Sequence, residues 1–289
     1  LQDGAHGGTA VHDRTYFYSL YVREPGGTLI ELASDGPGFA VDEPVEVLGS
    51  TLFVPGHVGG HRQDVIVQLP QFGLPGQPRT VYRDLPFVHR IHDADNPDGS
   101  AMILLHGTGG NEASLMPFAR RLAPHAMLIG LRGRANEEGV SRFFRRMGET
   151  SFDQKDIAGE AAALAEFVAE AISAYRLDGA KLTFVGHSNG ANMLAAAMLL
   201  NPGLVRQAVL LRPMMVLDPD RFVGLEGSRA LIIAGTHDRF LDQATELHTA
   251  LLRADADVTM ISLVADHGLI DADIEMAARW MAGEVLQPS

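Results

Sequence analysis

The chain has 289 residues, 46% of them hydrophobic, which is enough for one large domain with its own core and a smaller additional piece. Its formal net charge of −13 disfavours nucleic acid or an anionic membrane surface as the main partner, because both would repel it. The absence of cysteine excludes disulfides and thiolate metal sites and suits a reducing compartment, so we expect a cytoplasmic location.

Membrane and export signals are missing from the printed sequence. No apolar run reaches spanning length, and no basic start followed by an apolar core resembles a signal peptide. We therefore expect no membrane insertion. The sequence begins with Leu1 and not with Met, so we expect further residues upstream.

The first 50 residues predict a β-hairpin. Residues 16–22 and 28–32 read as strands, and a Pro-Gly-Gly tract between them can supply the turn. A two-stranded hairpin is marginal alone, so we expect it to pack on another domain or to form a homodimer contact through its edge. Residues 51–80 are rich in Pro and Gly, and we predict a long connector over the domain surface with a helical turn or two near residues 62–69.

From about residue 81 to residue 289, strand-like apolar runs alternate with amphipathic helical ones. We predict strands at residues 87–91, 101–105, 126–131, 182–185, 207–211, 230–234 and 258–264. We predict helices at residues 112–122, 156–175, 191–200, 241–254 and 271–281. This alternation predicts an α/β domain with a mostly parallel sheet covered by helices on both faces, whose reactive groups gather at the carboxyl ends of the strands.

A candidate nucleophile lies between a predicted strand and a predicted helix. Gly186, Ser188 and Gly190 form a G-x-S-x-G motif at this turn. A serine on such a turn is held in a strained conformation above the sheet edge, and the glycines remove side chains that would collide there. The motif alone also occurs by chance in a glycine-rich chain, so its chemistry depends on partners.

A nucleophilic serine needs a base and an acid, normally in the chain order Ser, Asp or Glu, His. His267 follows the strand predicted at residues 258–264, and Asp238 follows the strand at residues 230–234. Both therefore fall on the same rim of the sheet as Ser188, and we predict that they are its base and its acid.

Other assignments fit these residue types less well. His248 lies inside a predicted helix, where its ring would project sideways, and His237 is the direct neighbour of Asp238. Asp238 could instead cap the helix that begins near residue 241.

Acyl transfer also needs donors aimed at the developing oxyanion. The backbone N–H of Asn189, at the start of a helix, can supply one. The Gly-rich loop at residues 106–112 follows a strand and can supply the second from Thr108. Such a loop could instead cradle phosphate, but neither phosphate-binding glycine pattern is present.

The substrate pocket is the least determined part of the site. We expect Phe143 or Phe144 to border it, with Met214 and Met215 on another side; the alternative is that they only pack beneath the loop. The basic and aromatic run at residues 142–146 is too short to indicate a nucleic-acid surface. No long insertion suggests a lid, so we predict an open cleft for small or short-chain esters.

Four blocks carry a resemblance to a known family: residues 106–112 (HGTGGNE), 186–190 (GHSNG), 235–238 (GTHD) and 266–269 (DHGL). Together they resemble the phospholipase/carboxylesterase family of α/β-hydrolases over about residues 81–285. Arg132-Gly-Arg134, Glu138-Gly139 and residues 142–146 are similar to the branch often found beside quinone and hydroquinone degradation genes. The resemblance implies a triad of Ser188, Asp238 and His267, oxyanion donors at Thr108 and Asn189, and no metal or organic cofactor.

The N-terminal part resembles a different family. Residues 13–27, 29–35 and 37–44 look like the carboxyl end of a glyoxalase-like ring-cleaving dioxygenase, cut down to a remnant over about residues 1–50. In that family a glutamate at the position of Glu31 binds metal with histidines from earlier strands, which are absent here. The remaining candidates, His6, His12, His57 and His61, lie in Gly-rich segments. An ordinary hairpin carboxylate is the alternative for Glu31.

The combined prediction is a serine carboxylesterase that hydrolyses a small-molecule ester through an acyl-serine intermediate. The same triad would serve an acyl-protein or small-molecule thioesterase. A third alternative is a metal-dependent dioxygenase remnant or a non-catalytic binding module, in which the triad is idle.

Overall fold

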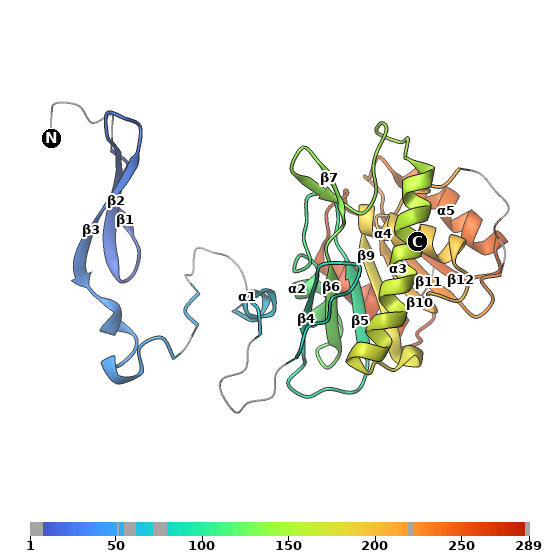
Figure 1. Ribbon diagram of the computed structural model, residues 1–289, viewed down its shortest axis with the longest axis horizontal. Coiled ribbons are helices and arrows are strands. Elements are labelled where there is room, and N and C mark those ends of the chain that lie inside the picture. Colours follow the sequence, from blue (N-terminus) through green and yellow to red (C-terminus); the bar gives the residue numbers. More distant parts are fainter. Residues whose placement is uncertain are drawn as a thin grey trace. The chain divides into compact units, whose positions relative to one another are not determined.

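The computed structural model describes residues 8–50, 52–54, 62–71, 80–218, 222 and 224–286. The chain divides into two compact units, Leu1–Gly59 and Gly60–Ser289 (Figure 1). The second unit thus begins inside the segment that the sequence predicts as a connector.

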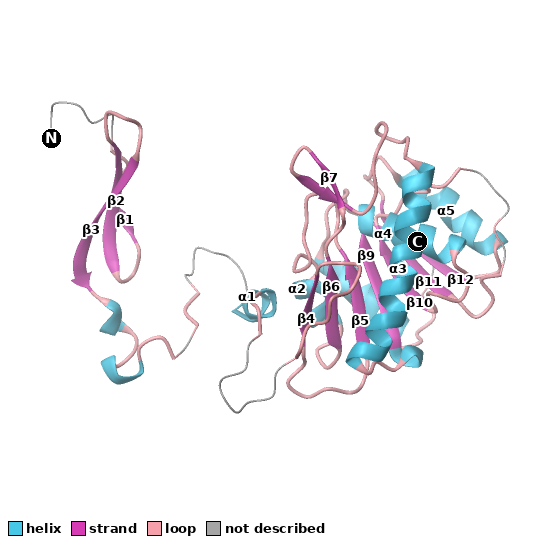
Figure 2. Ribbon diagram, in the orientation of Figure 1, coloured by secondary structure: helices cyan, strands magenta, loops and turns pink. Residues whose placement is uncertain are grey.

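The N-terminal unit is a three-stranded antiparallel sheet in the order β1-β2-β3 (Figure 2). The predicted hairpin consists of β2 (Phe17–Arg23) and β3 (Leu29–Pro37), and the short β1 (His12–Asp13) adds to β2. Two short 3₁₀ helices follow, η1 (Phe39–Val41) and η2 (Val45–Val47). Among residues 8–50, Ser19 is the only fully buried residue, so this unit has almost no core of its own.

The second unit is built on a seven-stranded sheet in the order β12-β11-β10-β9-β5-β6-β4. The strands are β4 (His89–His92), β5 (Ala101–Leu105), β6 (Met127–Leu131), β9 (Leu182–His187), β10 (Gln207–Leu211), β11 (Arg229–Gly235) and β12 (Asp257–Leu263). All pairings are parallel except that of the edge strand β4 with β6. The predicted α/β-hydrolase architecture is confirmed.

Helices cover both faces of this sheet (Figure 1). They are α1 (Arg62–Gln68), α2 (Met116–Leu122), α3 (Gln154–Tyr175), α4 (Asn189–Leu200), α5 (Leu241–Arg253) and α6 (Asp271–Met281), with a 3₁₀ turn at Gly179–Lys181. Alternate side chains of β5 serve opposite faces: Leu105 joins the core under α3, α4 and α5, whereas Leu104 joins the core under α1, α2 and α6.

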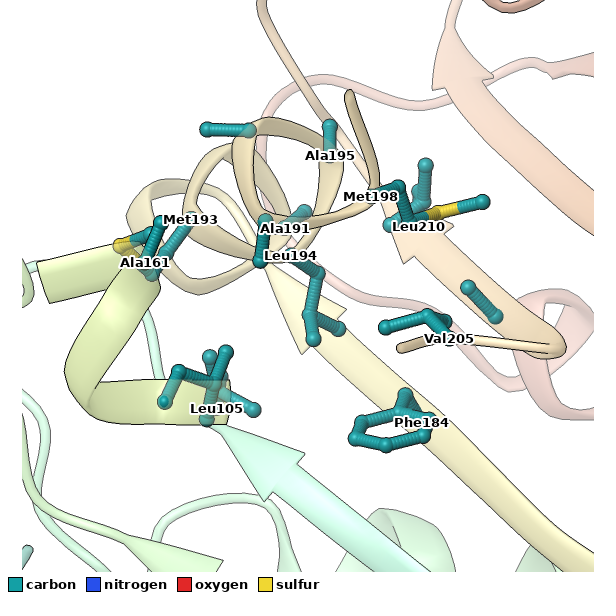
Figure 3. Close-up of a cluster of buried hydrophobic side chains, with 14 of the residues drawn as sticks. Leu105, Ala161, Phe184, Ala191, Met193, Leu194, Ala195, Met198, Val205 and Leu210 are labelled. Atoms are coloured by element: carbon teal, nitrogen blue, oxygen red, sulfur yellow. The ribbon is translucent and has the colours of Figure 1, made fainter. Parts of the chain in front are cut away.

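Helix α4 lies deepest, because it is apolar all round and every residue from Asn189 to Leu199 is buried. Figure 3 shows Leu194 of this helix above Leu105 of β5 and Phe184 of β9. A fully buried helix is packed on all sides, so Ser188, the residue directly before it, is attached to a rigid element.

Two local features differ from the predicted elements, whereas the helical segment predicted near residues 62–69 is present as α1. Helix α2 begins at Met116 and not at residue 112, because the Asn111 carboxamide accepts from the Ala113 N–H and folds this segment into a turn. A hairpin of β7 (Ala135–Glu137) and β8 (Val140–Arg142) is additional. In the predicted connector, α1 buries Val67 in the core shared with α2.

Candidate active site

Ser188 occupies the sharp turn between β9 and α4, with φ 51° and ψ −117°. Only glycine fits at both flanking positions of the motif. A Cβ on Gly186 would lie 2.6 Å from the Ala191 nitrogen, and one on Gly190 would lie 2.1 Å from the Leu105 carbonyl oxygen. The turn is therefore held in a strained conformation by close backbone packing on β5 and α4.

The structure brings the three predicted side chains together. Ser188 Oγ lies 2.8 Å from His267 Nε2, and His267 Nδ1 lies 2.7 Å from Asp238 Oδ2. Because a carboxylate can only accept, Nδ1 carries a proton, which leaves Nε2 of the neutral imidazole to accept the Ser188 hydroxyl proton. The Asp238 side chain is 3% exposed and its Oδ1 also accepts from the Phe240 N–H at 3.0 Å, so its direction is fixed. This chain of contacts can move a proton away from the serine.

The loops that carry these residues are tied to one another across the strand ends. Each first residue after a strand donates its N–H, at 2.8 Å, to a carbonyl in the last part of the next strand. The pairs are Ser188 with Leu211, Arg212 with Ile233, and Thr236 with Leu263. Hydrogen bonds therefore tie each of the loops that follow β9, β10 and β11 to the neighbouring strand.

Two side chains also hold the His267 loop in place through hydrogen bonds to its backbone carbonyls. Three consecutive carbonyls accept from two donors: Asp266 and Gly268 from Arg212, both at 3.0 Å, and His267 from His187 Nε2 at 3.2 Å. Burial lowers the pKa of His187 to about 4, so this imidazole is neutral near pH 7 and its Nε2 carries the donated proton. The catalytic geometry proposed from the sequence thus has support that the sequence did not reveal.

Arg212 itself is fixed by a buried ion pair. Its Nη1 and Nη2 lie 2.7 and 3.1 Å from the two carboxylate oxygens of Asp273, and both side chains are 0% exposed. The remaining donors reach backbone carbonyls, including that of Ile233 at 3.3 Å. Every direction of this guanidinium is therefore occupied.

The two predicted oxyanion donors come from separate loops that meet at one cavity. Asn189 begins α4, and Thr108 follows β5; both line the cavity that also contains Ser188. The Thr108 loop is held by the buried His106, whose Nδ1 donates to the Gly107 carbonyl at 2.7 Å and whose Nε2 accepts from the Gly133 N–H at 3.0 Å. Desolvation lowers the pKa of His106, which keeps it neutral.

The cavity has a volume of about 1090 Å³, and its wall corrects part of the pocket prediction. Met214 lines it, but Met215 packs against the core. Phe143 and Phe144 do not line it: both are fully buried, where Phe143 packs on His106 at 4.9 Å between ring centroids. Arg142 and Arg146 of the same run line the cavity instead, and Phe152 and Phe240 are its aromatic residues.

Glu31 has a partner that is not a metal ligand. The Tyr21 hydroxyl donates to its carboxylate at 2.7 Å, and this hydrogen bond is the main cause of the lowered pKa of Glu31. Within the described parts of the chain, no three His, Asp or Glu side chains are grouped to hold a metal ion. His6, His57 and His61 lie outside the described residues. Among the described helices, none combines the length and apolarity needed to cross a membrane.

Known proteins similar to the chain fall into two groups, although no family model matches it. MhqD of Bacillus subtilis (strain 168), named as a hydrolase, is 32% identical over 183 residues, which cover 63% of this chain and 92% of MhqD. A carboxylesterase from Mesorhizobium loti superposes with a TM-score of 0.68 at 41% identity, covering 71% of this chain and 98% of that one. The Bacillus cereus carboxylesterase gives 0.65 at 33% identity, with 68% and 94% covered.

The second group consists of short matches. MhqA of Bacillus subtilis (strain 168), named as a ring-cleaving dioxygenase, is 43% identical over 61 residues, which cover 21% of this chain and 19% of MhqA. MhqE, named likewise, is 48% identical over 59 residues, with 20% of each chain covered. The predicted dioxygenase-like remnant is therefore confirmed as a resemblance to about a fifth of such proteins.

Proposed function

Because the chain belongs to the phospholipase/carboxylesterase family of α/β-hydrolases and is an ester hydrolase, we propose that it is a serine carboxylesterase. The observation that carries this proposal is the unbroken contact series from Ser188 Oγ through His267 to Asp238, at 2.8 and 2.7 Å. These distances are within hydrogen-bond reach for a nucleophile, its base and the group that orients the base.

In the first half-reaction His267 Nε2 takes the hydroxyl proton while Ser188 Oγ bonds to the ester carbonyl carbon. Asp238 stabilises the imidazolium that forms. The backbone N–H groups of Thr108 and Asn189 stabilise the oxyanion. The ester C–O bond then breaks, His267 returns its proton to the departing alcohol, and the acyl group stays on Ser188.

In the second half-reaction the same groups act on water. His267 removes a proton from a water molecule as the water oxygen bonds to the acyl carbon; the bond between the acyl carbon and Ser188 Oγ then breaks, and His267 returns the proton to Ser188 Oγ. The products are the carboxylic acid and the regenerated enzyme.

We further propose that small or short-chain esters are preferred. The segment between β6 and α3, which carries the hairpin of β7 and β8, lines the cavity with charged residues such as Glu137, Glu138 and Arg142, and a charged wall suits short polar esters better than long apolar chains. A series of 4-nitrophenyl esters of increasing chain length tests this. We expect kcat/KM to fall beyond short acyl chains, and a clear preference for long chains would contradict it.

A fluorophosphonate probe tests the serine mechanism. We expect labelling of the intact protein and its loss in Ser188→Ala. Ser114→Ala is the matched control, because Ser114 also lines the cavity but lies on the α2 side of the loop. Absence of labelling in the intact protein would overturn the proposal. Matched oxygen and sulfur esters then separate a carboxylesterase from a thioesterase.

A further inference from the structure

Arg142, the last residue of β8, is a buried charge in the wall of the active-site cavity. It is 5% exposed, yet it lines the same cavity as Ser188. Burying a guanidinium is costly unless oxygen atoms surround it, and desolvation lowers the pKa of Arg142. The cost of burying this charge must be offset by hydrogen-bond acceptors or by an opposite charge.

The described residues supply only part of that compensation. Arg142 Nη1 donates to the neutral Thr108 hydroxyl at 2.9 Å. Its Nε has no hydrogen-bond acceptor among the described residues, and the Glu137 carboxylate lies 3.7 Å away from it. Glu137 is also shared, because it accepts from the Arg146 N–H at 2.7 Å. The charge of Arg142 is therefore incompletely paired.

Arg212, the other arginine that is buried among the described residues, shows what full pairing looks like. Arg212 has both oxygens of Asp273 and three backbone carbonyls within 3.3 Å. It does not line the cavity. Of these two buried guanidinium groups, the one that lines the cavity of Ser188 is thus the one whose hydrogen-bonding capacity is unfilled.

A second polar group on the cavity wall is also incompletely hydrogen-bonded. Asn189 lines the cavity, and its Nδ2 is a second buried donor without a partner among the described residues. Its Oδ1 accepts from the N–H of Phe143, the residue next to Arg142, at 2.7 Å. Two exposed charges of the lining, in contrast, pair with each other: Arg239 Nη1 lies 2.7 Å from the Glu149 carboxylate.

We propose that the cavity selects esters that carry a carboxylate a few bonds from the ester carbonyl, such as monoesters of short dicarboxylic acids, and that Arg142 recognises this carboxylate. The inference rests on the proposed esterase function. A planar guanidinium matches a carboxylate in a two-point contact, and pairing is strong where water is excluded. The contact of Arg142 with Thr108 places the recognised group near the proposed oxyanion donor.

The test compares two esters of nearly equal shape. Monomethyl succinate carries a carboxylate where methyl 4-oxopentanoate carries a neutral acetyl group. We expect wild-type kcat/KM to favour the succinate ester by about 10- to 100-fold, as for loss of a hydrogen-bonded charge partner. We expect Arg142→Gln to remove most of this preference with a smaller effect on the neutral ester, and Arg142→Lys to restore part of it.

Two variants separate recognition from support of the loop. Thr108→Val removes only the hydroxyl that Arg142 contacts, so it should lower kcat/KM for both esters by the same factor. Arg239→Gln removes an exposed rim charge and should leave both values within about 2-fold. If Arg142→Gln lowers kcat/KM by the same factor for both esters, the proposal is overturned. Arg142 then only supports the position of Thr108.

The wild-type enzyme alone also gives a decisive result. Turnover of the neutral ester without preference for the charged one refutes the role of Arg142 while leaving the serine esterase intact. Turnover of neither ester together with an unlabelled Ser188 refutes both proposals. Inhibition of neutral-ester turnover by succinate in the wild type, weakened at least 10-fold in Arg142→Gln, supports recognition of the carboxylate.

Discussion

Two polar contacts of the same length belong to very different surroundings in the two units. In the N-terminal sheet the Tyr21 hydroxyl lies 2.7 Å from Glu31, on strands open to water. In the α/β unit Arg212 Nη1 lies 2.7 Å from Asp273, and both side chains are fully buried. Water can replace the first contact but not the second, so burial and not distance determines what each contributes to stability.

The same contrast holds for the apolar residues of the two units. In β3 of the N-terminal unit, Leu29, Ile30 and Leu32 are all exposed. The sheet of the α/β unit, in contrast, has a continuous core on each face. We therefore expect folding stability and chemistry to reside in the α/β unit.

The largest effect is expected at the nucleophile. Ser188→Ala should lower kcat for ester hydrolysis by roughly 10⁵- to 10⁶-fold, because the remaining groups can stabilise an oxyanion but cannot form the acyl-serine. Steady-state kinetics with a 4-nitrophenyl ester measures this. A loss below about 100-fold would mean that another residue carries out the chemistry.

The next largest effect is expected at the buried ion pair. Arg212→Met should lower the free energy of unfolding by about 3–5 kcal/mol, because it leaves the Asp273 charge buried and unpaired. Urea unfolding measures this. The double variant Arg212→Met with Asp273→Leu is the control and should recover part of the loss, since no buried charge remains. A single-variant loss under about 1 kcal/mol would contradict the assignment.

A pH-dependent effect is expected at His187. Its pKa is about 4 in the folded protein and about 6.5 in an unfolded chain. Between these values the unfolded state binds the proton more readily, so the free energy of unfolding should fall by up to about 3 kcal/mol as the pH drops from 6.5 to 4. This part of the pH dependence should disappear in His187→Asn, measured by urea unfolding at several pH values. Parallel curves for the two proteins would contradict it.

A much smaller effect is expected in the N-terminal sheet. Tyr21→Phe removes the exposed contact with Glu31 and should leave the free energy of unfolding nearly unchanged, because water replaces the lost hydrogen bond. Thermal unfolding compared with the wild type measures this. A change as large as that of Arg212→Met would overturn the comparison between the two units.

The smallest effect on catalysis is expected from removing the N-terminal unit. Deletion of residues 1–50 should leave kcat/KM within about 2-fold, because every residue in the proposed chemistry lies in the α/β unit. The same variant tests the predicted homodimer contact through the N-terminal sheet. The mass in solution should then fall to that of the shortened monomer, and an unchanged oligomeric state would dispose of the contact.

Hydrophobic periodicity, together with the rule that reactive groups gather at the carboxyl ends of parallel strands, predicts much of the fold and of the site. The apolar runs predicted the strands and helices, and parallel topology required Ser188, Asp238 and His267 to share one rim. Boundaries were weaker where side chains fold the backbone locally, as Asn111 does before α2. The β7 and β8 strands have three residues each, too few to show a period.

The residues that support the catalytic loops cannot be predicted from the sequence, for a different reason. The partner of Arg212 lies 61 positions later, and nothing local marks either residue as buried. From the sequence, Phe143 or Phe144 is expected to border the pocket, and nothing singles out Arg142 for its wall. In the structure the reverse holds, because the Phe143 amide bonds to Asn189 and turns its ring toward the core.

The hydrogen bonds that join successive strand exits have a consequence for motion. The loops of Ser188, Arg212 and Thr236 each depend on the end of the next strand. Fraying of a strand end removes the acceptor from the loop that follows the preceding strand, so we expect the three loops to loosen together when this edge of the sheet unfolds locally. Misalignment of one member of the site is then expected to accompany loosening of the others.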